Sequence, residues 1–187
     1  MLKKVFLASK SPRRQELLKQ MNIDFQLLLK DVNEDFPTDL EPLKVAEYIA
    51  VKKANAFELK DQDAILITAD TVVIIDDEIL GKPVDENDAI AMLGKLNGKT
   101  HQVVTGVAIK SINNISSFDC ITKVTFNAIS KDDIEYYVKN HQPLDKAGAY
   151  GIQDWIGAVA VNSIIGSYTN VMGLPTHELY ERLKKYF

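Results

Sequence analysis

Apolar residues follow two different spacings along this chain, and the two spacings alternate. Alternation or short apolar runs, typical of β-strands, occur at residues 5–8, 23–29, 64–75, 103–109, 121–126 and 156–161. Apolar residues spaced three and four apart, typical of amphipathic helices, occur between them at residues 12–21, 45–57, 86–96, 131–138 and 175–183. Because strands and helices interleave from end to end, the pattern predicts an α/β fold.

Capping and turn residues refine these boundaries. Ser11 with Pro12, Asp85 and Ser130 each stand where a helix begins. Turns at residues 76–77 and 113–114 join neighbouring strands like hairpins, so the sheet is expected to be mixed. Residues 33–42, 147–154 and 166–175 are expected to form loops, and Asp70 with Thr71 is expected to interrupt the apolar run at 64–75.

Length, composition and charge narrow the class of protein. The 187 residues fit a single domain, residues 1–187, with two lobes, and 46% hydrophobic with 26% charged residues indicates a globular chain. A net charge of −4 argues against a nucleic-acid partner. No apolar run approaches the roughly 18 residues of a membrane span, and the first apolar stretch stops at Lys10, too early for a signal peptide. With Cys120 as the sole cysteine, a cytoplasmic protein is expected.

The segment from Ser9 to Arg14 is the first candidate for chemistry. A predicted strand leads into a loop and then a helix start, where unpaired N–H groups and a partial positive charge suit phosphate oxygens. Ser9 and Ser11 supply hydroxyls, and Arg13 and Arg14 supply guanidinium groups that bind phosphate bidentately. The alternative is a well-capped helix with two solvated arginines.

Two acidic residues are candidates for a metal or a water. Asp70 follows the strongly apolar residues 65–67, where a buried carboxylate needs a metal, a cation or hydrogen bonds; the alternative is an aspartate that caps a turn at the strand end. Glu34 lies in an acidic loop and is a second oxygen ligand suited to magnesium.

Two lysines and a glutamine complete the candidates. Lys53 lies on the predicted helix at 45–57 and Lys82 in the turn at 81–83, and solvated lysines are the alternative for both. Gln153 follows glycines that allow close backbone approach and offers both a donor and an acceptor.

Other motifs fail on spacing or position. Residues 98–100 look like the end of a P-loop, but Leu93 stands where glycine is needed. His101, His141 and His177 lack zinc-ligand spacing. Cys120 lies within a predicted strand and is interpreted as a core residue.

Together these segments resemble the Maf family of nucleoside triphosphate pyrophosphatases. The resemblance runs nearly end to end through seven ordered motifs, at residues 7–14, 31–34, 53–54, 69–73, 80–83, 146–153 and 166–175. It implies a two-lobed mixed α/β fold, similar to inosine triphosphate pyrophosphatases, with the site in a central cleft. It also implies a homodimer and metal-dependent hydrolysis, with Mg²⁺ or Mn²⁺, of a nucleoside triphosphate to the monophosphate and pyrophosphate.

The resemblance also implies a role for each candidate. Asp70 is the expected general base, and with Glu34 the expected metal ligand. Six further residues are expected to bind the nucleotide: Ser9, Arg13, Arg14, Lys53, Lys82 and Gln153. The chain departs from the family pattern at Asp154-Trp155, where glycine is commoner, and at Asn33, where an acid is common.

The substrate base is predicted from Gln153. Its carbonyl can accept from N3–H of uracil or thymine while its NH₂ donates to O4, so dTTP and UTP are the expected substrates, with Thr71 helping to shape the pocket. The alternatives are a 7-methyl-GTP or purine triphosphate pyrophosphatase on the same scaffold, and a non-enzymatic nucleotide-binding regulator of septum formation.

Overall fold

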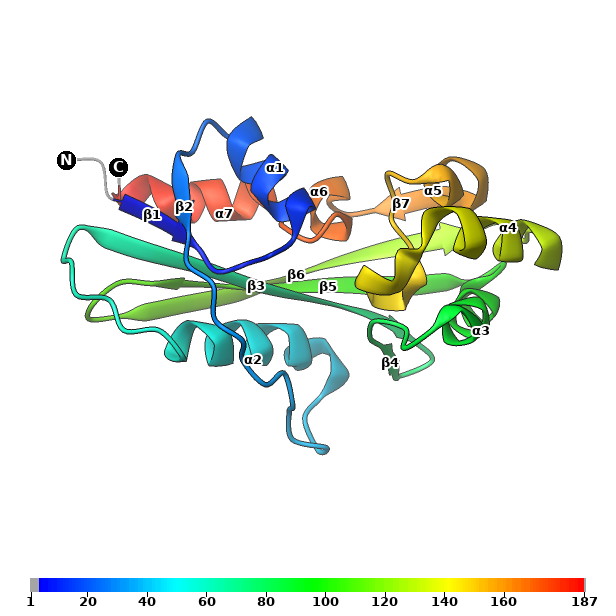
Figure 1. The fold of residues 1–187 in the computed structure, drawn as a ribbon, viewed down its shortest axis with the longest axis horizontal. Coiled ribbons are helices and arrows are strands. Elements are labelled where there is room, and N and C mark those ends of the chain that lie inside the picture. Colours follow the sequence, from blue (N-terminus) through cyan, green and yellow to red (C-terminus); the bar gives the residue numbers. More distant parts are fainter. Residues whose placement is uncertain (1–3, 187) are drawn as a thin grey trace. The chain divides into compact units, whose positions relative to one another are not determined.

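The computed structural model describes residues 4–186 and shows an α/β fold (Figure 1). These residues divide into two compact units. The first unit comprises residues 4–70, 105–120 and 173–186, and the second comprises residues 71–104 and 121–172. The predicted α/β class is therefore confirmed, and each unit is described separately below.

Within residues 4–186, seven strands form one sheet, in the order β2-β1-β3-β5-β6-β7 with β4 paired to β3. Strand β1 is parallel to β2 and β3, whereas β4 is antiparallel to β3 and β7 is antiparallel to β6. The predicted mixed sheet is confirmed. The strands are β1 (Lys4–Leu7), β2 (Phe25–Leu27), β3 (Ala64–Ile75), β4 (Glu78–Leu80), β5 (Thr100–Lys110), β6 (Ile115–Phe126) and β7 (Val161–Ile165).

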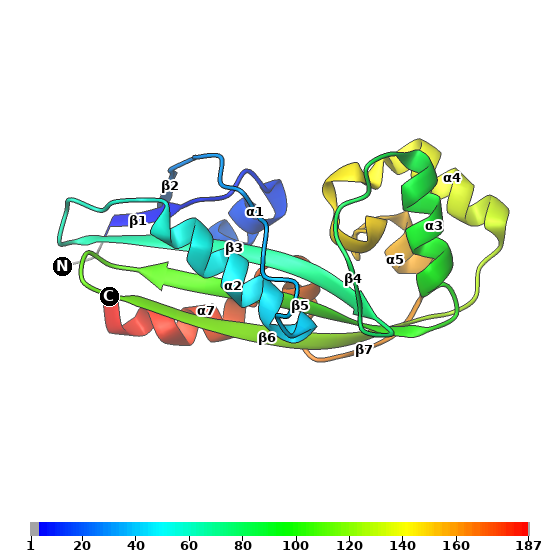
Figure 2. The same ribbon diagram turned by 90° about the horizontal axis from the view of Figure 1, so that it is seen from below.

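In the first unit, helices cover both faces of the sheet. Helix α2 (Pro42–Asn55) lies on one face, and α1 (Pro12–Gln20) with α7 (Thr176–Leu183) on the other (Figures 1 and 2). The periodic apolar side chains predicted from the sequence are the buried ones: Leu17 and Leu18 in α1, Val45, Ala46, Ile49, Ala50 and Ala54 in α2, and Leu179 and Leu183 in α7. A short 3₁₀ turn, Lys184–Tyr186, follows α7.

In the second unit, helix α3 (Glu86–Leu96) packs against α4 (Lys131–His141) and against two 3₁₀ turns, Pro143–Asp145 and Ala147–Ala149. The predicted caps are confirmed: the Asp85 side chain accepts from the amide of Asp88, and Ser130 forms a reciprocal capping box with Asp133. Short helices α5 (Trp155–Ala160) and α6 (Tyr168–Val171) complete the unit. Among residues 4–186, no helix has the length and apolar character needed to cross a membrane.

Two expected elements differ from the structure. Residues 156–161 were expected to form a strand, but most of them form α5, because Ile156 and Ala160, four residues apart, are both buried on one helix face. A short apolar run has no period that distinguishes a strand from a helix, so tertiary packing determines which of the two this segment forms. The loop expected at 166–175 contains α6, with Ser167 accepting from the amide of Asn170 at its start.

The expected interruption of the strand at Asp70 and Thr71 is also wrong. Strand β3 runs unbroken from Ala64 to Ile75 and contains both residues. Backbone pairing does not depend on side-chain polarity, provided that the buried charge has a partner. The strand predicted from the alternation at residues 23–29 is confirmed as β2. It is an edge strand of the sheet, and Leu27 and Leu29 are exposed.

Candidate functional site

One lysine joins two of the predicted acids in the first unit. The Lys53 Nζ atom lies 2.7 Å from Asp70 Oδ1 and 2.7 Å from Glu34 Oε1. The side chains of Lys53 and Asp70 are only 15% and 13% exposed, whereas Glu34 is 47% exposed. The ammonium therefore compensates a largely buried carboxylate on one side and a more accessible carboxylate on the other.

Packing of α2 on β3 places Lys53 beside Asp70. The apolar face of α2 is buried, and the buried Thr68 hydroxyl donates to the Ala50 carbonyl at 2.6 Å. Lys53 follows Ala50 by three residues, so it lies one turn further along the same side of the helix. Asp70 follows Thr68 by two residues and therefore points to the same face of the sheet. Lys53 and Asp70 therefore meet because residues three apart share a side of the helix and residues two apart share a face of the strand.

Arg14 joins the helix start to the backbone beside Asp70. Its Nε donates to the Gly173 carbonyl at 2.7 Å, and its Nη1 donates to the Ala69 carbonyl at 2.9 Å and to Ser9 Oγ at 3.4 Å. Burial lowers the pKa of the Arg14 guanidinium, an effect that Asp70 and Glu34 partly oppose and that the charge of Arg13 reinforces. These couplings, together with the ion pairs of Lys53, define one electrostatic cluster: Arg13, Arg14, Lys53, Glu34 and Asp70.

The start of α1 carries positive charge where helices usually carry negative charge. Its first turn contains no acidic residue but contains both Arg13 and Arg14, next to the partial positive charge of the helix N-terminus. Ser11 caps the helix, accepting from the Arg14 amide at 3.5 Å, while Ser9 Oγ accepts from the Ser11 amide at 3.2 Å. An arrangement of this kind is suited to an anion with several oxygens, such as phosphate.

Glu34 and Asp70 form a donor set that fits Mg²⁺ or Mn²⁺. Among the residues that the structure describes, no group of three or more His, Cys, Asp and Glu side chains is placed to hold a metal. Two carboxylates nevertheless meet at a single cationic atom, Lys53 Nζ. Magnesium is typically held by one or two carboxylates, with water and substrate phosphate completing its shell. The pair therefore fits a metal that binds together with a phosphate ligand.

Three predicted residues belong to the second unit. Thr71, half-buried, is the residue after Asp70 on β3, while Lys82 and Gln153 are exposed in loops. The loops that carry Lys82 and Gln153 are held together, since the Gly148 amide donates to the Gly81 carbonyl at 3.0 Å. Gly148 also packs on β3, where a Cβ atom would lie 2.8 Å from Val73 Cγ2. Three of the predicted motifs therefore meet in this unit.

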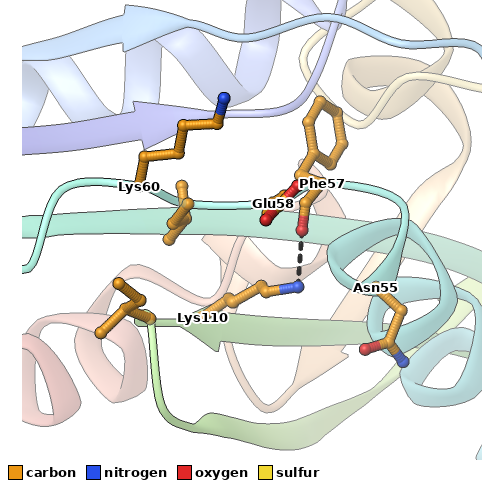
Figure 3. A pocket seen from close by; sticks show the side chains of 7 residues that line it. Asn55, Phe57, Glu58, Lys60 and Lys110 are labelled. Atoms are coloured by element: carbon orange, nitrogen blue, oxygen red, sulfur yellow. Dashed lines mark hydrogen bonds between the residues drawn. The ribbon is translucent and has the colours of Figure 1, made fainter.

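A pocket at the C-terminal end of α2 contains none of the predicted site residues. It is lined by residues 55, 57–60, 110 and 112 (Figure 3). Its Lys110 side chain donates to the carbonyls of Phe57 at 2.6 Å and Ala54 at 3.1 Å. Lys110 therefore caps the end of the helix, and the pocket is separate from the candidate site.

Sequence reasoning missed two features of the site. It assigned Lys53 to phosphate alone and did not foresee that this lysine joins both acids. It also treated Arg13 and Arg14 alike, because nothing in the sequence identifies the carbonyls of Ala69 and Gly173 as acceptors for one of them. Every residue has a backbone carbonyl, so the residue types in a sequence do not show which carbonyls accept a hydrogen bond from a side chain.

Comparisons with known proteins show what this chain is similar to. The family model described as Maf-like protein matches residues 4–186. A dTTP/UTP pyrophosphatase of Flavobacterium psychrophilum is 48% identical, over 95% of this chain and 91% of its own length. One of Porphyromonas gingivalis is 50% identical, over 98% and 94% respectively. The structure of the Staphylococcus aureus Ham1 protein is similar in fold, with a TM-score of 0.55 at 17% identity, covering 96% of this chain and 100% of its own.

Proposed function

The chain belongs to the Maf-like protein family, and from this premise we propose that it hydrolyses dTTP and UTP to the nucleoside monophosphate and pyrophosphate. The observation that carries the proposal is the pairing of Lys53 with both Glu34 and Asp70. This pairing brings together a buried carboxylate, an accessible carboxylate and a positive charge. The start of α1, which carries two arginines, belongs to the same cluster. Cleavage of a charged anhydride needs these components together.

Basic groups hold the triphosphate. Arg13 and Arg14, with Ser9 and the N-terminus of α1, offer donors to phosphate oxygens and stabilise the charge that develops on the leaving pyrophosphate. Arg14 enters the reaction already oriented by two backbone carbonyls, so little reorganisation is needed. Lys53 adds further positive charge, and Lys82 is also assigned to the triphosphate.

Asp70 orients the attacking water and accepts its proton. Lys53 fixes one carboxylate oxygen, Oδ1, at 2.7 Å, and we assign the other oxygen, Oδ2, to the water. General-base assistance of this kind is typically worth about 10²–10⁴-fold in rate. Loss of the Asp70 charge is therefore expected to affect turnover more than substrate binding.

Glu34 and Asp70 are the residues that would hold Mg²⁺ or Mn²⁺. Such an ion would neutralise phosphate charge and lower the pKa of a bound water. The accessible side chain of Glu34, beside Lys53, suits a ligand that binds metal and nucleotide together. With three cations and two acids in the cluster, the protein alone offsets only part of the charge of a triphosphate.

Gln153 is the residue assigned to the base. The exposed Gln153 amide presents an acceptor to N3–H and a donor to O4 of uracil or thymine, and Thr71 lies beside Asp70 in β3. A site built on paired hydrogen bonds rejects a base whose edge leaves them unpaired. The expected preference is UTP and dTTP over GTP, ATP and 7-methyl-GTP.

Two further properties are part of the proposal. We place the enzyme in the cytoplasm, where its nucleotide substrates are made. We also propose that it forms a homodimer, which size-exclusion chromatography with light scattering tests directly: a single species at twice the 20.9 kDa chain mass supports it, and one at the chain mass contradicts it.

Pyrophosphate release from a panel of triphosphates tests the proposed activity. UTP, dTTP, GTP, ATP and 7-methyl-GTP are each supplied with Mg²⁺, with Mn²⁺ and with excess chelator. Release from UTP and dTTP that stops in chelator is expected. Activity that persists in chelator contradicts the metal assignment, and a protein inactive on the whole panel contradicts the enzymatic function.

A matched pair of lysine variants tests whether the site is the one described. Lys53→Met should abolish most of the activity, because it removes the cation between Glu34 and Asp70. Lys44→Met is the control: Lys44 lies on the same helix and also contacts two acids, Asp119 at 2.7 Å and Glu47 at 3.9 Å, on a more exposed part of the surface. Equal losses in the two variants would argue against a special role for Lys53.

A further inference from the structure

The turn that carries Gln153 in the second unit is held at both ends by one hydroxyl group. The Gly151 amide donates to Tyr137 Oη at 3.1 Å, and Tyr137 Oη donates to Asp154 Oδ2 at 2.8 Å. The Asp154 amide donates back to the Gly151 carbonyl at 3.0 Å, closing the turn. Gln153 lies exposed between these two anchored residues.

The Asp154 carboxylate forms its hydrogen bond with the residue that holds this turn and does not cap the helix that follows. Asp154 occupies the N-cap position of α5, where an aspartate side chain usually accepts a hydrogen bond from the first helical turn. It makes no such bond here. Its oxygen faces the Tyr137 hydroxyl, with Lys146 Nζ 3.7 Å away. The carboxylate therefore stabilises residues 151–154 through Tyr137 and makes no capping hydrogen bond to α5.

Close packing leaves the turn little freedom to move. A Cβ atom on Gly151 would lie 2.5 Å from Asp154 Oδ2, and one on Gly157 would lie 1.9 Å from the Ile152 carbonyl oxygen. Both contacts are shorter than side chains tolerate. The two glycines therefore allow the carboxylate and the backbone to approach as closely as they do.

The hydroxyl that holds the turn is itself fixed. Tyr137 is fully buried on α4, and its ring stacks on His141 with centroids 5.0 Å apart. A tyrosine hydroxyl is protonated at neutral pH, and burial raises the pKa of the Tyr137 hydroxyl further, so the group is a donor to Asp154. Tyr150, the residue before the turn, is also held: its Oη lies 2.8 Å from His101 Nε2.

We propose that Tyr137 and Asp154 are positioning residues that fix the turn at 151–154 and thereby set the preference of the enzyme for uracil and thymine over purines. The inference rests on the proposed function, in which Gln153 reads the base. A primary amide discriminates between bases only if its orientation is fixed, because a freely turning amide satisfies donors and acceptors equally well. The hydroxyl supplies this restraint.

Tyr137→Phe in the full-length chain tests the proposal, since it removes one oxygen and keeps the buried ring. The kcat/KM for UTP should fall about tenfold, which is the effect of one lost hydrogen-bonded restraint, while that for GTP changes much less. Asp154→Ala should behave like Tyr137→Phe. Asp154→Asn, which retains an oxygen to accept from the hydroxyl, should restore most of the UTP preference.

Tyr136→Phe is the matched control. Tyr136 is the preceding residue on α4; it is 51% exposed and its ring packs on Trp155. Loss of its hydroxyl should leave the ratio of UTP to GTP turnover unchanged. Amide hydrogen exchange at Gly151 provides a second measurement, independent of activity: it should become faster in Tyr137→Phe and stay unchanged in Tyr136→Phe.

Failure of this inference and failure of the proposed function give different results. A wild-type protein that prefers UTP, with a preference that survives in Tyr137→Phe, overturns the positioning role alone. Equal losses for UTP and GTP in Tyr137→Phe also overturn it, because they show a structural effect without selectivity. A wild-type protein that releases no pyrophosphate from UTP overturns the proposed function and the selectivity role with it.

Discussion

Arg14 is held by backbone carbonyls from two distant segments of the chain. Arg14 donates to the carbonyls of Ala69 and Gly173, both of which belong to buried residues. It therefore combines a structural role with its proposed contact to phosphate. This arginine is not the solvated residue of the alternative interpretation, and removing it leaves two buried acceptors without their donor.

Alanine variants test the roles of the two arginines. Arg14→Ala is expected to lower the free energy of unfolding by about 2–3 kcal/mol, because buried acceptors lose a charged donor. Arg13→Ala is expected to lower turnover, because it removes a proposed contact to phosphate. Urea unfolding and pyrophosphate release on both proteins are the measurements, and an Arg14→Ala protein as stable as the wild type would contradict the structural role of Arg14.

Asp70 is the residue on which turnover should depend most. Asp70→Asn keeps the shape of the side chain and removes its charge and basicity, so kcat should fall by at least about 10²-fold at saturating metal. The fold should persist, because Glu34 still pairs with Lys53. Asp119→Asn, which removes the acid paired with Lys44, is the control. Near-normal kcat in Asp70→Asn would remove Asp70 from the mechanism.

At the scale of elements, close approach of α2 to β5 holds the first unit together. Gly106 on β5 lies directly against the backbone of α2, where a Cβ atom would be 2.2 Å from the Glu47 amide nitrogen and 2.4 Å from the Ala46 carbonyl oxygen. The contacting atoms are backbone, so they cannot move aside as a flexible side chain would. This contact and the Thr68 hydrogen bond to Ala50 set the distance between α2 and the sheet. They thereby set the position of the Lys53 ammonium group relative to Asp70.

Two glycine-to-alanine changes test this packing. Gly106→Ala is expected to destabilise the protein by about 3 kcal/mol, because the helix must shift to admit a methyl group. Gly94→Ala is the matched control: a Cβ atom there has nothing within 4 Å, and the site lies inside α3. It should stabilise the protein by about 0.5–1 kcal/mol, since alanine favours a helix over glycine. Denaturant midpoints of both variants decide the comparison.

At the scale of the whole molecule, a buried histidine couples stability to pH. His101 packs edge-on against Phe126 and Tyr150, at centroid distances of 5.0 and 5.4 Å. Burial lowers the pKa of His101 from 6.5 to about 4. The unfolded chain therefore binds a proton between pH 6.5 and 4 that the folded chain does not, and folding loses stability as the pH falls through this range.

His101→Gln should reduce this pH dependence. Between pH 7 and pH 4, the wild type is expected to lose on the order of 3 kcal/mol more of its unfolding free energy than the variant, whatever the absolute stability of each. Contributions of carboxylates are common to both proteins and cancel in the comparison. His177→Gln, at an exposed position on α7, is the control. Parallel curves for wild type and His101→Gln would show that this histidine does not carry the effect.

The whole chain is acidic, with a net charge of −4, and yet its proposed substrate is a polyanion. The structure resolves this by concentrating charge locally. Arg13, Arg14 and Lys53 form one electrostatic cluster, and the acids within it, Glu34 and Asp70, are the proposed metal ligands. The net charge argues against a nucleic-acid backbone as partner but does not argue against a nucleotide.

Much of the architecture was determined by the sequence itself. The α/β class, the mixed sheet and the starts of α1, α3 and α4 were predicted correctly, because caps, turns and apolar periods act over a few residues. The motifs also supplied the candidate residues, although their proposed roles stay predictions. Local signals failed at residues 155–160, where a run of small and β-branched residues fits a strand or a helix equally well.

Only the tertiary structure decided which candidates lie together and what holds them. Lys53 joins Glu34 and Asp70, and Arg14 reaches the carbonyls of Ala69 and Gly173, across sequence separations that no local pattern records. Asp154, which departs from the family pattern, gained a role only when the fold placed Tyr137 beside it. Contacts between distant segments depend on how whole elements pack, and backbone acceptors have no signature in residue type. For these reasons the sequence by itself determined most of the elements and supplied the candidate residues, and the fold decided which of them lie together.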